Sequence, residues 1–207
     1  MTLHEPEVAA GPDPVYRDAG YVERPGLLDP GFCHYLCTYL ALLGETGRLE
    51  RDPVIPDAAF VYGDPAFDVL LDLLTPEVES HVGAALVPTY SFARIYGAGS
   101  SLYHHRDRPS CEHSLSVHLG SSGHPWPLSL IDLHGRQVDL IQSPGDAVAY
   151  QGMLLEHWRD PLPLGQHAQL FLHWVRADGP HAAQAFDGRD SLGVPSVLGD
   201  PVDAERS

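Results

Sequence analysis

Cysteine is scarce in this chain of 207 residues, which contains only Cys33, Cys37 and Cys111. An odd number of cysteines without paired C-x-x-C motifs provides neither a disulfide framework nor the ligand set of a structural zinc site. We therefore expect reduced thiols in a cytoplasmic protein, with Cys33 and Cys37 buried in an apolar helical stretch. A chain of this length can bury a sufficient core without cross-links.

Basic residues and long apolar runs are also few. The 12 Arg and Lys residues stand against 28 Asp and Glu, which gives a net charge of −16. Such a field repels phosphate backbones and anionic lipid surfaces, so neither nucleic acid nor a membrane is an expected partner. The sequence has no run of about 18 uncharged apolar residues, and its first residues lack the basic and apolar regions of a secretory signal. These features predict a soluble protein.

Several common catalytic motifs are missing. The sequence has no G-x-S-x-G, no G-x-x-x-x-G-K-[ST] and no G-x-G-x-x-G after a strand, so hydrolase, P-loop and dinucleotide-binding functions have no support. We expect a single domain at residues 25–180, preceded at residues 1–24 by a loose arm rich in Pro, Gly and acidic side chains. Residues 181–207 form a C-terminal extension that either folds over the domain or stays partly mobile.

Two stretches have the periodicity of amphipathic helices. In residues 27–44 and again in residues 65–81, apolar side chains recur at intervals of three and four. Asp29 and Pro30 suit the start of the first helix, because Asp caps a helix well and Pro fits the first turn, where no backbone donor is missed. Both helices are expected to cover one face of a sheet.

From residue 86 onward the pattern changes to short segments of β-branched, aromatic and aliphatic residues, separated by Gly, Pro and Asp. The expected strands are residues 90–96, 102–105, 114–119, 128–134, 137–141, 147–150, 154–158 and 168–175. So many short strands in one run favour a barrel or a double-sheet roll over alternating β-α units.

Three potential metal ligands occur in the order H-x-D…H: His105, Asp107 and, fifty positions further on (157 − 107 = 50), His157. Residues i and i+2 of an extended segment point the same way, so His105 and Asp107 can reach one ion from a strand end. In a rolled β structure the third ligand can come from a distant strand that lies alongside. Two imidazoles and one carboxylate on one face of a metal leave adjacent positions open, as a non-heme Fe(II) oxygenase requires. The H-x-D tripeptide alone is weak, because 13 histidines make chance matches easy.

Five segments follow one another in an order that is more telling than any one of them. They are ARIYGAG at 93–99, HRD at 105–107, SPGDA at 143–147, HWR at 157–159 and FLHW at 171–174. In this order they resemble the Fe(II)- and 2-oxoglutarate-dependent oxygenases of the prolyl-4-hydroxylase-like group. The resemblance covers about residues 86–176 and implies a mainly β fold with flanking helices, the double-stranded β-helix (jelly roll, cupin-like). It also implies that His105, Asp107 and His157 bind Fe(II), with 2-oxoglutarate and O2 as cosubstrates.

The expected anchor of 2-oxoglutarate departs from the family pattern. The resemblance implies an Arg or Lys about ten residues past the distal histidine for the remote carboxylate of 2-oxoglutarate, but His167 stands there (157 + 10 = 167). Arg159 is the predicted substitute, because at i+2 from His157 it faces the same pocket about 7 Å further along the strand. A guanidinium can also hold a carboxylate bidentately. The alternative for Arg159 is a surface pair with an acid such as Asp160.

Other residues are weaker candidates for the cosubstrate site. Arg94 offers a second guanidinium from another strand, and Tyr96 can donate a hydrogen bond to the same carboxylate. His167 and Gln169 line the same stretch of the last strand. The remaining histidines are expected to be structural, among them His104, His113, His118, His124, His134 and His173.

These patterns predict an enzyme that hydroxylates a small metabolite, an amino acid or a short peptide with release of succinate and CO2. No catalytic residue beyond the metal ligands is predicted, and desaturation or cyclisation are alternative outcomes of the same chemistry. Two other functions stay open. One is a cupin-like metalloenzyme that acts on a directly chelated substrate without 2-oxoglutarate, which the missing basic residue at position 167 favours. The other is a metal-binding module without turnover.

Overall fold

The computed structural model describes residues 11–193 of the chain. Its helices are α1 Pro14–Ala19, α2 Pro30–Glu45, α3 Pro65–Leu73 and α4 Thr75–Val82, and two short 3-10 segments are η1 Pro109–Cys111 and η2 Ala182–Gly188. The strands are β1 Tyr21–Arg24, β2 Glu50–Arg51, β3 Ala58–Tyr62, β4 Leu86–Gly97, β5 Leu102–His105, β6 His113–Ser122, β7 Leu128–Ile131, β8 Gln137–Leu140, β9 Ala147–Tyr150, β10 His157–Arg159 and β11 Gln166–Arg176.

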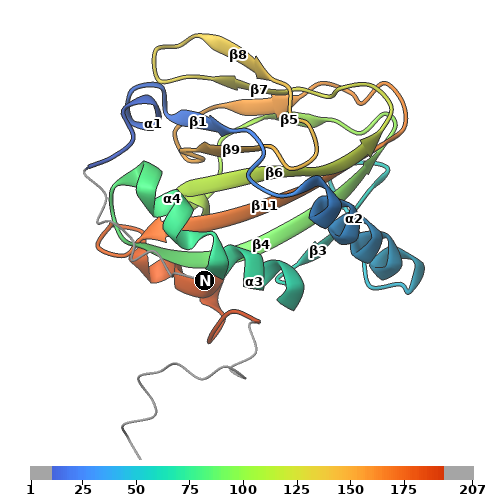
Figure 1. Cartoon of the computed structure of the whole chain (residues 1–207), viewed down its shortest axis with the longest axis horizontal. Coiled ribbons are helices and arrows are strands. Elements are labelled where there is room, and N and C mark those ends of the chain that lie inside the picture. Colours follow the sequence, from blue (N-terminus) through green and yellow to red (C-terminus); the bar gives the residue numbers. More distant parts are fainter. Residues whose placement is uncertain (1–10, 194–207) are drawn as a thin grey trace, which may run out of the picture.

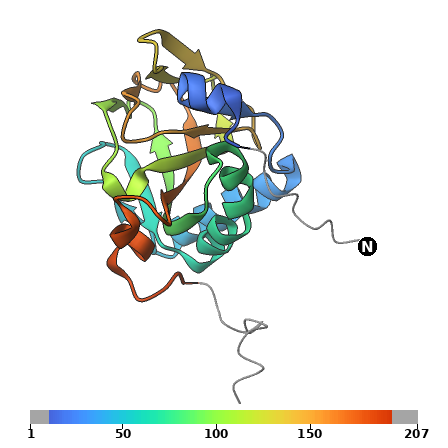
Figure 2. The same ribbon diagram turned by 90° about the vertical axis from the view of Figure 1, so that its left-hand side faces the viewer.

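Two sheets form a roll (Figure 1). The larger sheet has the strand order β1-β9-β6-β11-β4-β3-β2 and the smaller one β5-β10-β7-β8, with antiparallel pairing in both. From β4 to β11 the chain passes back and forth between the two sheets, which is the topology of a double-stranded β-helix. The predicted fold class is therefore confirmed. Figure 2 shows that the red C-terminal segment lies at the edge of the roll away from the β7-β8 hairpin.

The larger sheet has one apolar face and one face that mixes polar and aromatic side chains, because side chains alternate along each strand. On β11, Leu170, Leu172 and Trp174 are fully buried in the main hydrophobic core, together with residues of α2, α3 and α4. Burial of each such leucine contributes about 1.5–3 kcal/mol to folding. The alternate β11 residues, Gln169 and Phe171 among them, face the interior between the sheets, where the polar groups of the chain are concentrated.

Helix α2 begins as the sequence predicts. The Asp29 carboxylate accepts hydrogen bonds from the backbone amides of Gly31 and Phe32 at 2.8 and 3.1 Å, and Pro30 occupies the first turn. The buried face of this helix includes Cys33, which confirms its expected position in the core, whereas Cys37 is only half-buried.

The second predicted helix, residues 65–81, is instead two helices, α3 and α4, which meet at Leu74. Pro76 explains the break, because proline has no backbone N–H to continue the hydrogen bonding of α3 and fits only the first turn of a helix, which is its position in α4. Thr75 stabilises the junction, since its hydroxyl donates to the Leu71 carbonyl at 3.0 Å and accepts from Trp174 Nε1 at 2.9 Å.

The loose arm predicted at residues 1–24 is wrong for the part that the structure describes, while residues 1–10 lie outside the described residues. The Asp13 carboxylate caps α1 by accepting from Val15 N at 2.8 Å. Gly20, with a left-handed φ of 83°, then turns the chain into β1, which adds to the edge of the larger sheet by pairing with β9. Composition missed these elements because both are short and depend on tertiary contacts, notably the burial of Tyr16.

Four more strands differ from the prediction. Strands β2 and β3 were not predicted, because they lie between the two helical patterns and before the continuous β-rich region. The strand expected at 154–158 is found at residues 157–159 instead. Leu154 and Leu155 form a turn, in which both of their amides donate to the Gln151 carbonyl oxygen at 3.0 Å. The strand expected at 128–134 ends at Ile131, where Asp132 accepts from the backbone amides of the following turn.

Within residues 11–193, no helix combines the length and the apolar character that crossing a bilayer requires. Of the C-terminal extension, residues 181–193 fold against the roll, and residues 194–207 lie outside the described part of the chain.

Two glycines test how closely β11 approaches β6. Gly165 and Gly47 have left-handed φ values of +83° and +71°, but a Cβ at 165 would overlap the Ser122 carbonyl oxygen, whereas one at 47 would meet no atom within 4 Å. We expect Gly47→Ala to lower the free energy of unfolding by about 1 kcal/mol and Gly165→Ala by about 3 kcal/mol or more. Urea unfolding of both variants measures the difference, and equal losses would contradict this contact.

Candidate metal centre

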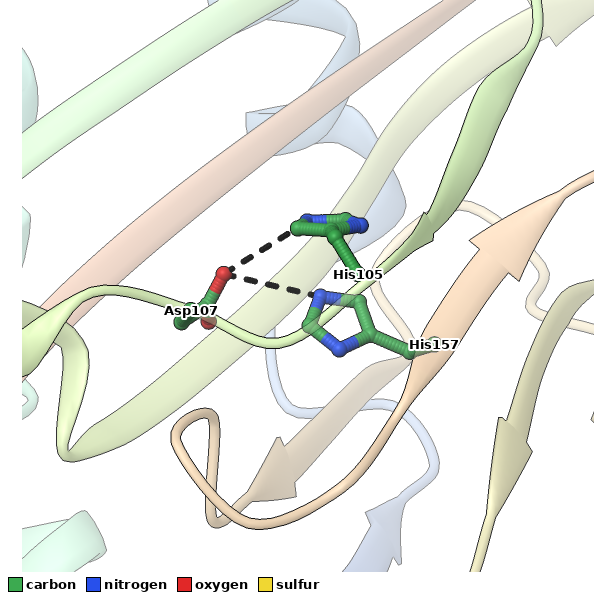
Figure 3. Close-up of side chains that lie close together, drawn as sticks. All are labelled: His105, Asp107 and His157. Atoms are coloured by element: carbon green, nitrogen blue, oxygen red, sulfur yellow. Dashed lines mark ion pairs between the residues drawn. The ribbon is translucent and has the colours of Figure 1, made fainter.

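Side chains from two paired strands, and from the loop that follows the first of them, converge on one point (Figure 3). His105 ends β5, Asp107 follows in the loop, and His157 begins β10, which pairs with β5 so that His157 lies opposite His105. Asp107 Oδ1 is 3.6 Å from His105 Nε2 and 3.6 Å from His157 Nε2. The structure thus brings the three predicted ligands together, although Asp107 lies just beyond the strand rather than within it.

Backbone carbonyls set the protonation of both imidazoles. His105 Nδ1 is 2.9 Å from the Tyr103 carbonyl oxygen, and His157 Nδ1 is 2.9 Å from that of Leu155. A carbonyl only accepts hydrogen bonds, so each Nδ1 carries the proton and each Nε2 keeps a free lone pair. Burial also lowers the pKa of His157, which keeps its ring neutral.

This donor set fits a metal ion. Two Nε2 lone pairs and one carboxylate oxygen all lie within 4.8 Å of one another, so one ion can be bonded by all three. Neutral imidazoles with a carboxylate suit Fe(II), and the Nδ1–H bonds to carbonyls are the outer contacts that orient such ligands. The three residues also line a cavity, so an ion held there would have room for further ligands.

The ligand loop is held by close contacts. Asp107 Oδ2 accepts a hydrogen bond from Ser114 Oγ at 3.2 Å, and the Asp107 amide donates to the Gly152 carbonyl at 2.9 Å. Ser114 Oγ is also 2.9 Å from Nδ1 of His173. A Cβ at position 152 would overlap Asp107 Oδ2, so the absence of a side chain there is what admits the carboxylate.

Asp107, Cys111 and His173 form a second group with possible ligand atoms within 4.8 Å of one another. This group suits a metal less well, because a thiol must lose its proton to bind one. Burial raises the pKa of Cys111 to about 12, and its sulfur already contacts the Tyr90 hydroxyl at 3.1 Å. Burial likewise lowers the pKa of His173 to about 4, so its ring is neutral.

A cavity of about 280 Å³ opens above the three converging side chains. Its walls are mainly aromatic and aliphatic, apart from the charged residues Asp52 and Arg94. Besides the three candidate ligands, it is lined by Asp52, Val54, Ile55, Tyr90, Phe92, Arg94, Leu102, Tyr103, Tyr150, Phe171 and His173.

Arg159, the predicted anchor, lies two residues past His157 and is 2% exposed. Its guanidinium donates to the Trp126 carbonyl, lies 4.8 Å from the Trp126 ring and contacts Gln142 Oε1 at 3.4 Å. Among the described residues no carboxylate pairs with it, so the alternative of a surface pair with Asp160 is wrong, and its Nε has no hydrogen-bond partner. Burial lowers the pKa of Arg159 to about 10, which leaves it charged at neutral pH.

The other polar candidates lie around this guanidinium. His167 Nε2 donates to Gln169 Oε1 at 2.7 Å, and the His167 ring stacks on that of His118 with centroids 4.3 Å apart. Tyr96 lies beside both His167 and Trp126. Burial and the nearby charge of Arg159 lower the pKa of His167 to about 2, so His167 cannot replace the missing cation.

Arg94 differs from Arg159 because it has a counter-ion. It pairs with Asp52 at 2.6 Å and donates to the Tyr96 hydroxyl at 3.0 Å. Its charge is therefore already compensated, in contrast to that of Arg159.

Sequence reasoning missed several contributors to the site. Ser114 and Gly152 support Asp107, and His118 was expected to be only structural. The period of two on β6 carries a signal for Ser114 and His118, because both point to the same side of that strand as Ser116. Nothing local marks Gly152, whose role depends on a contact across the fold.

No family model and no curated protein matches the chain, but its structure is similar to solved ones. A prolyl-4-hydroxylase from Pseudomonas putida is 16% identical with a TM-score of 0.65, over 78% of this chain and 95% of the other. HygX from Streptomyces hygroscopicus, solved with nickel and 2-oxoglutarate bound, is 16% identical with a TM-score of 0.63, over 79% and 85%. The non-heme alpha ketoglutarate dependent carbocyclase SnoK from nogalamycin biosynthesis is 14% identical with a TM-score of 0.68, over 79% and 82%.

The chain has the fold of these proteins. At such low identities the likeness concerns the fold alone, and at that level the resemblance found in the sequence is confirmed.

The C-terminal segment fastens the loop that follows Asp107. Asp187 accepts two hydrogen bonds from Arg108, both at 2.7 Å, one from Ser110 at 2.8 Å and one from Tyr62 at 2.5 Å. Phe186 and Asp187 have left-handed φ values of 53° and 54°, which is unfavourable for a side chain as bulky as that of Phe. The charge-assisted contacts of Asp187 offset this strain.

Gly152→Ala tests the fit around Asp107. The added methyl group displaces the carboxylate, so we expect affinity for Co(II) or Fe(II), measured anaerobically by calorimetry, to fall about 10- to 100-fold. Gly135→Ala is the control, because Gly135 has open space around its Cα and lies in the β7-β8 turn. Equal metal affinity in both variants would contradict the described position of Asp107.

Asp187→Asn tests the C-terminal clamp. Asn tolerates a left-handed backbone, so the change removes the charge and spares the turn. We expect Tm to fall by several degrees and metal affinity to weaken, because the loop carrying Asp107 loses its strongest tie. The matched control, Asp178→Asn, removes the partner of Arg176 in an exposed pair and should leave both quantities unchanged. A wild-type Tm in Asp187→Asn would contradict the clamp.

Proposed function

We propose that this protein is an Fe(II)- and 2-oxoglutarate-dependent oxygenase that hydroxylates a small molecule. The observation that carries the proposal is the convergence of His105 Nε2, Asp107 Oδ1 and His157 Nε2 beneath a cavity, with both Nδ1 protons already engaged. This is the facial set of two histidines and one carboxylate that non-heme Fe(II) oxygenases use. Solved proteins of the same fold include one with nickel and 2-oxoglutarate bound, which agrees with this choice of cosubstrate.

Fe(II) bound by these residues would supply the activation of O2, with 2-oxoglutarate as the reductant. One oxygen atom then enters a substrate C–H bond, and the other is incorporated into succinate as CO2 is released. In this scheme His105 and His157 bind the ion through Nε2, because each keeps a proton on Nδ1, which donates a hydrogen bond to the carbonyl oxygen of residue 103 or 155. Ser114 keeps Asp107 oriented by bonding to the oxygen atom that faces away from the two imidazoles.

Arg159 would hold the remote carboxylate of 2-oxoglutarate. A buried cation without a counter-ion is costly, and an incoming carboxylate removes that cost while gaining charge-assisted hydrogen bonds. The chain has no lysine, so only an arginine can supply a permanent cation in the interior. The neighbouring Tyr96, His167 and Gln169 add polar contacts around the same site.

The partners and location follow from composition. A net charge of −16 disfavours nucleic acid and anionic membranes, and a small molecule fits a cavity of about 280 Å³. The three cysteines are free, which suits a reducing compartment, and we infer a cytoplasmic location.

A second candidate function has one observation in its favour. The last strand offers His167 in place of a basic residue, and that ring is neutral, so a cupin-like enzyme that chelates its substrate without 2-oxoglutarate would need nothing at this position. Such an enzyme would leave the buried charge of Arg159 unexplained. A metal-binding module without turnover would also leave the substrate-sized cavity without a role.

The direct test is turnover of 2-oxoglutarate. Anaerobically purified protein is mixed with Fe(II), 2-oxoglutarate and O2, and succinate is measured. The proposal expects succinate release that depends on both Fe(II) and O2. Its absence in protein that binds Fe(II) but not 2-oxoglutarate would favour the cupin-like function, and bound Fe(II) together with 2-oxoglutarate but no succinate under any condition would favour the module.

Arg159→Gln tests the anchor separately. Loss of the buried charge should raise the Kd for 2-oxoglutarate at least about 30-fold, measured by calorimetry on the metal-loaded protein without O2. Arg136→Gln is the control, because the Arg136 side chain is 69% exposed, although its partner Asp132 is buried, and Arg136 lies in the β7-β8 turn. Unchanged affinity in Arg159→Gln would show that another residue anchors the cosubstrate.

A further inference from the structure

We propose that the cavity above His105, Asp107 and His157 takes an uncharged, planar ring compound as substrate, in preference to an amino acid, a peptide or an acidic metabolite. This inference rests on the proposed function, because it names the substrate class of the same site. It narrows the range of substrates that the sequence left open.

One wall of the cavity is built from aromatic side chains on the interior face of the larger sheet. Tyr90 and Phe92 lie on β4, and Phe171 pairs with Phe92 from the neighbouring strand β11, with the Phe92 and Phe171 centroids 6.4 Å apart. Rings of the next strand, β3, extend this wall sideways, since Phe60 stacks on Phe92 with centroids 4.8 Å apart and Tyr62 on Tyr90 with centroids 5.1 Å apart. Rings that brace one another in this way form a rigid aromatic wall, which favours flat molecules that can stack on it or meet it edge to face.

The charged groups of the cavity already have partners. Arg94 pairs with Asp52 at 2.6 Å and lies 4.7 Å from the Phe92 ring. The Asp52 carboxylate also accepts from the amides of Val54 and Ile55, both at 2.9 Å. A substrate carboxylate or ammonium group would therefore be buried without a counter-ion or would have to break this pair, which is costly.

The mouth of the cavity is apolar as well. Tyr103 and Val54 line it and are 62% and 58% exposed, which is high for large apolar side chains. They offer contact area to a part of the substrate that extends beyond the cavity. A fused ring system, or a ring with an apolar substituent, can contact both the aromatic wall and the apolar mouth of the cavity.

The reaction balances with a single C–H bond. A ring compound R–H reacts with O2 and 2-oxoglutarate to give R–OH, succinate and CO2, so the substrate supplies one hydrogen atom and receives one oxygen atom. A ring stacked on the aromatic wall can present its edge, or a substituent on that edge, to the candidate ligands, because both line the same cavity.

Binding of indole and its charged derivatives tests the inference without turnover. Metal-free protein is titrated by calorimetry with indole, indole-3-acetate and tryptophan, which share one ring system and differ in charge. We expect indole to bind at least about tenfold tighter than either derivative, because each of these buries an unpaired charge. Tryptamine, a cationic derivative, is compared with indole in the Asp107→Asn variant, because Asp107 could otherwise pair with its ammonium group. We expect tryptamine to bind this variant more weakly than indole does.

Two variants identify the site of binding. Phe171→Leu keeps an apolar side chain but removes a ring from the aromatic wall, so it should weaken indole binding about tenfold. Tyr35→Leu, on the exposed face of α2, is the matched control and should change nothing. No measurable indole binding, or tighter binding of any charged derivative, would overturn the inference. Because the titrations need neither Fe(II) nor 2-oxoglutarate, a preference for indole in a protein that releases no succinate would refute the proposed function and leave the assigned ligand class standing.

Discussion

The pairing of β10 with β5 is the contact on which the rest of the site depends. It sets His157 opposite His105, and the two rings lie with centroids 4.2 Å apart. Beyond this pair the register shifts, so that Arg159 lies opposite Leu102 rather than Tyr103. Because side chains alternate along a strand, a slip by one residue would turn His157 and Arg159 away from the interior together. One pairing therefore links the candidate metal ligand to the buried cation behind it.

The interior of the roll is graded in polarity along its length. Neutral imidazoles and one carboxylate lie at one end, aromatic rings line the cavity beside them, and a buried guanidinium with amide and imidazole neighbours lies further along β10. An interior of this kind contributes less to folding than an apolar one, since polar groups lose hydration when they are buried. The helices compensate on the other face of the larger sheet, where the main hydrophobic core lies. Stability and chemistry are thus divided between the two faces of one sheet.

The sequence was most informative where local pattern and chemistry coincide. The β-rich region, the start of α2 at Asp29 and the grouping of His105, Asp107 and His157 follow from spacing and residue type. Arg159 was predicted as the anchor because an i+2 position shares the face of its strand, and its role in binding 2-oxoglutarate stays a prediction.

Other features depended on contacts between distant parts of the chain. Strand β1 forms by adding to an existing sheet edge, and Gly152 matters only because Asp107 folds against it. Periodicity also could not separate α3 from α4, since the apolar spacing continues through the break at Pro76. The substrate class needed the structure for the same reason, because the Arg94–Asp52 pair joins residues whose sequence positions reveal no relation.

A crystal structure of the protein soaked without O2 in Fe(II) and 2-oxoglutarate, with the iron located by anomalous scattering, tests the central claim most directly. The account predicts one iron peak within bonding distance of His105 Nε2, Asp107 Oδ1 and His157 Nε2, with the far carboxylate of 2-oxoglutarate against the Arg159 guanidinium. A peak between Asp107, Cys111 and His173, or iron bonded without His157, would contradict it.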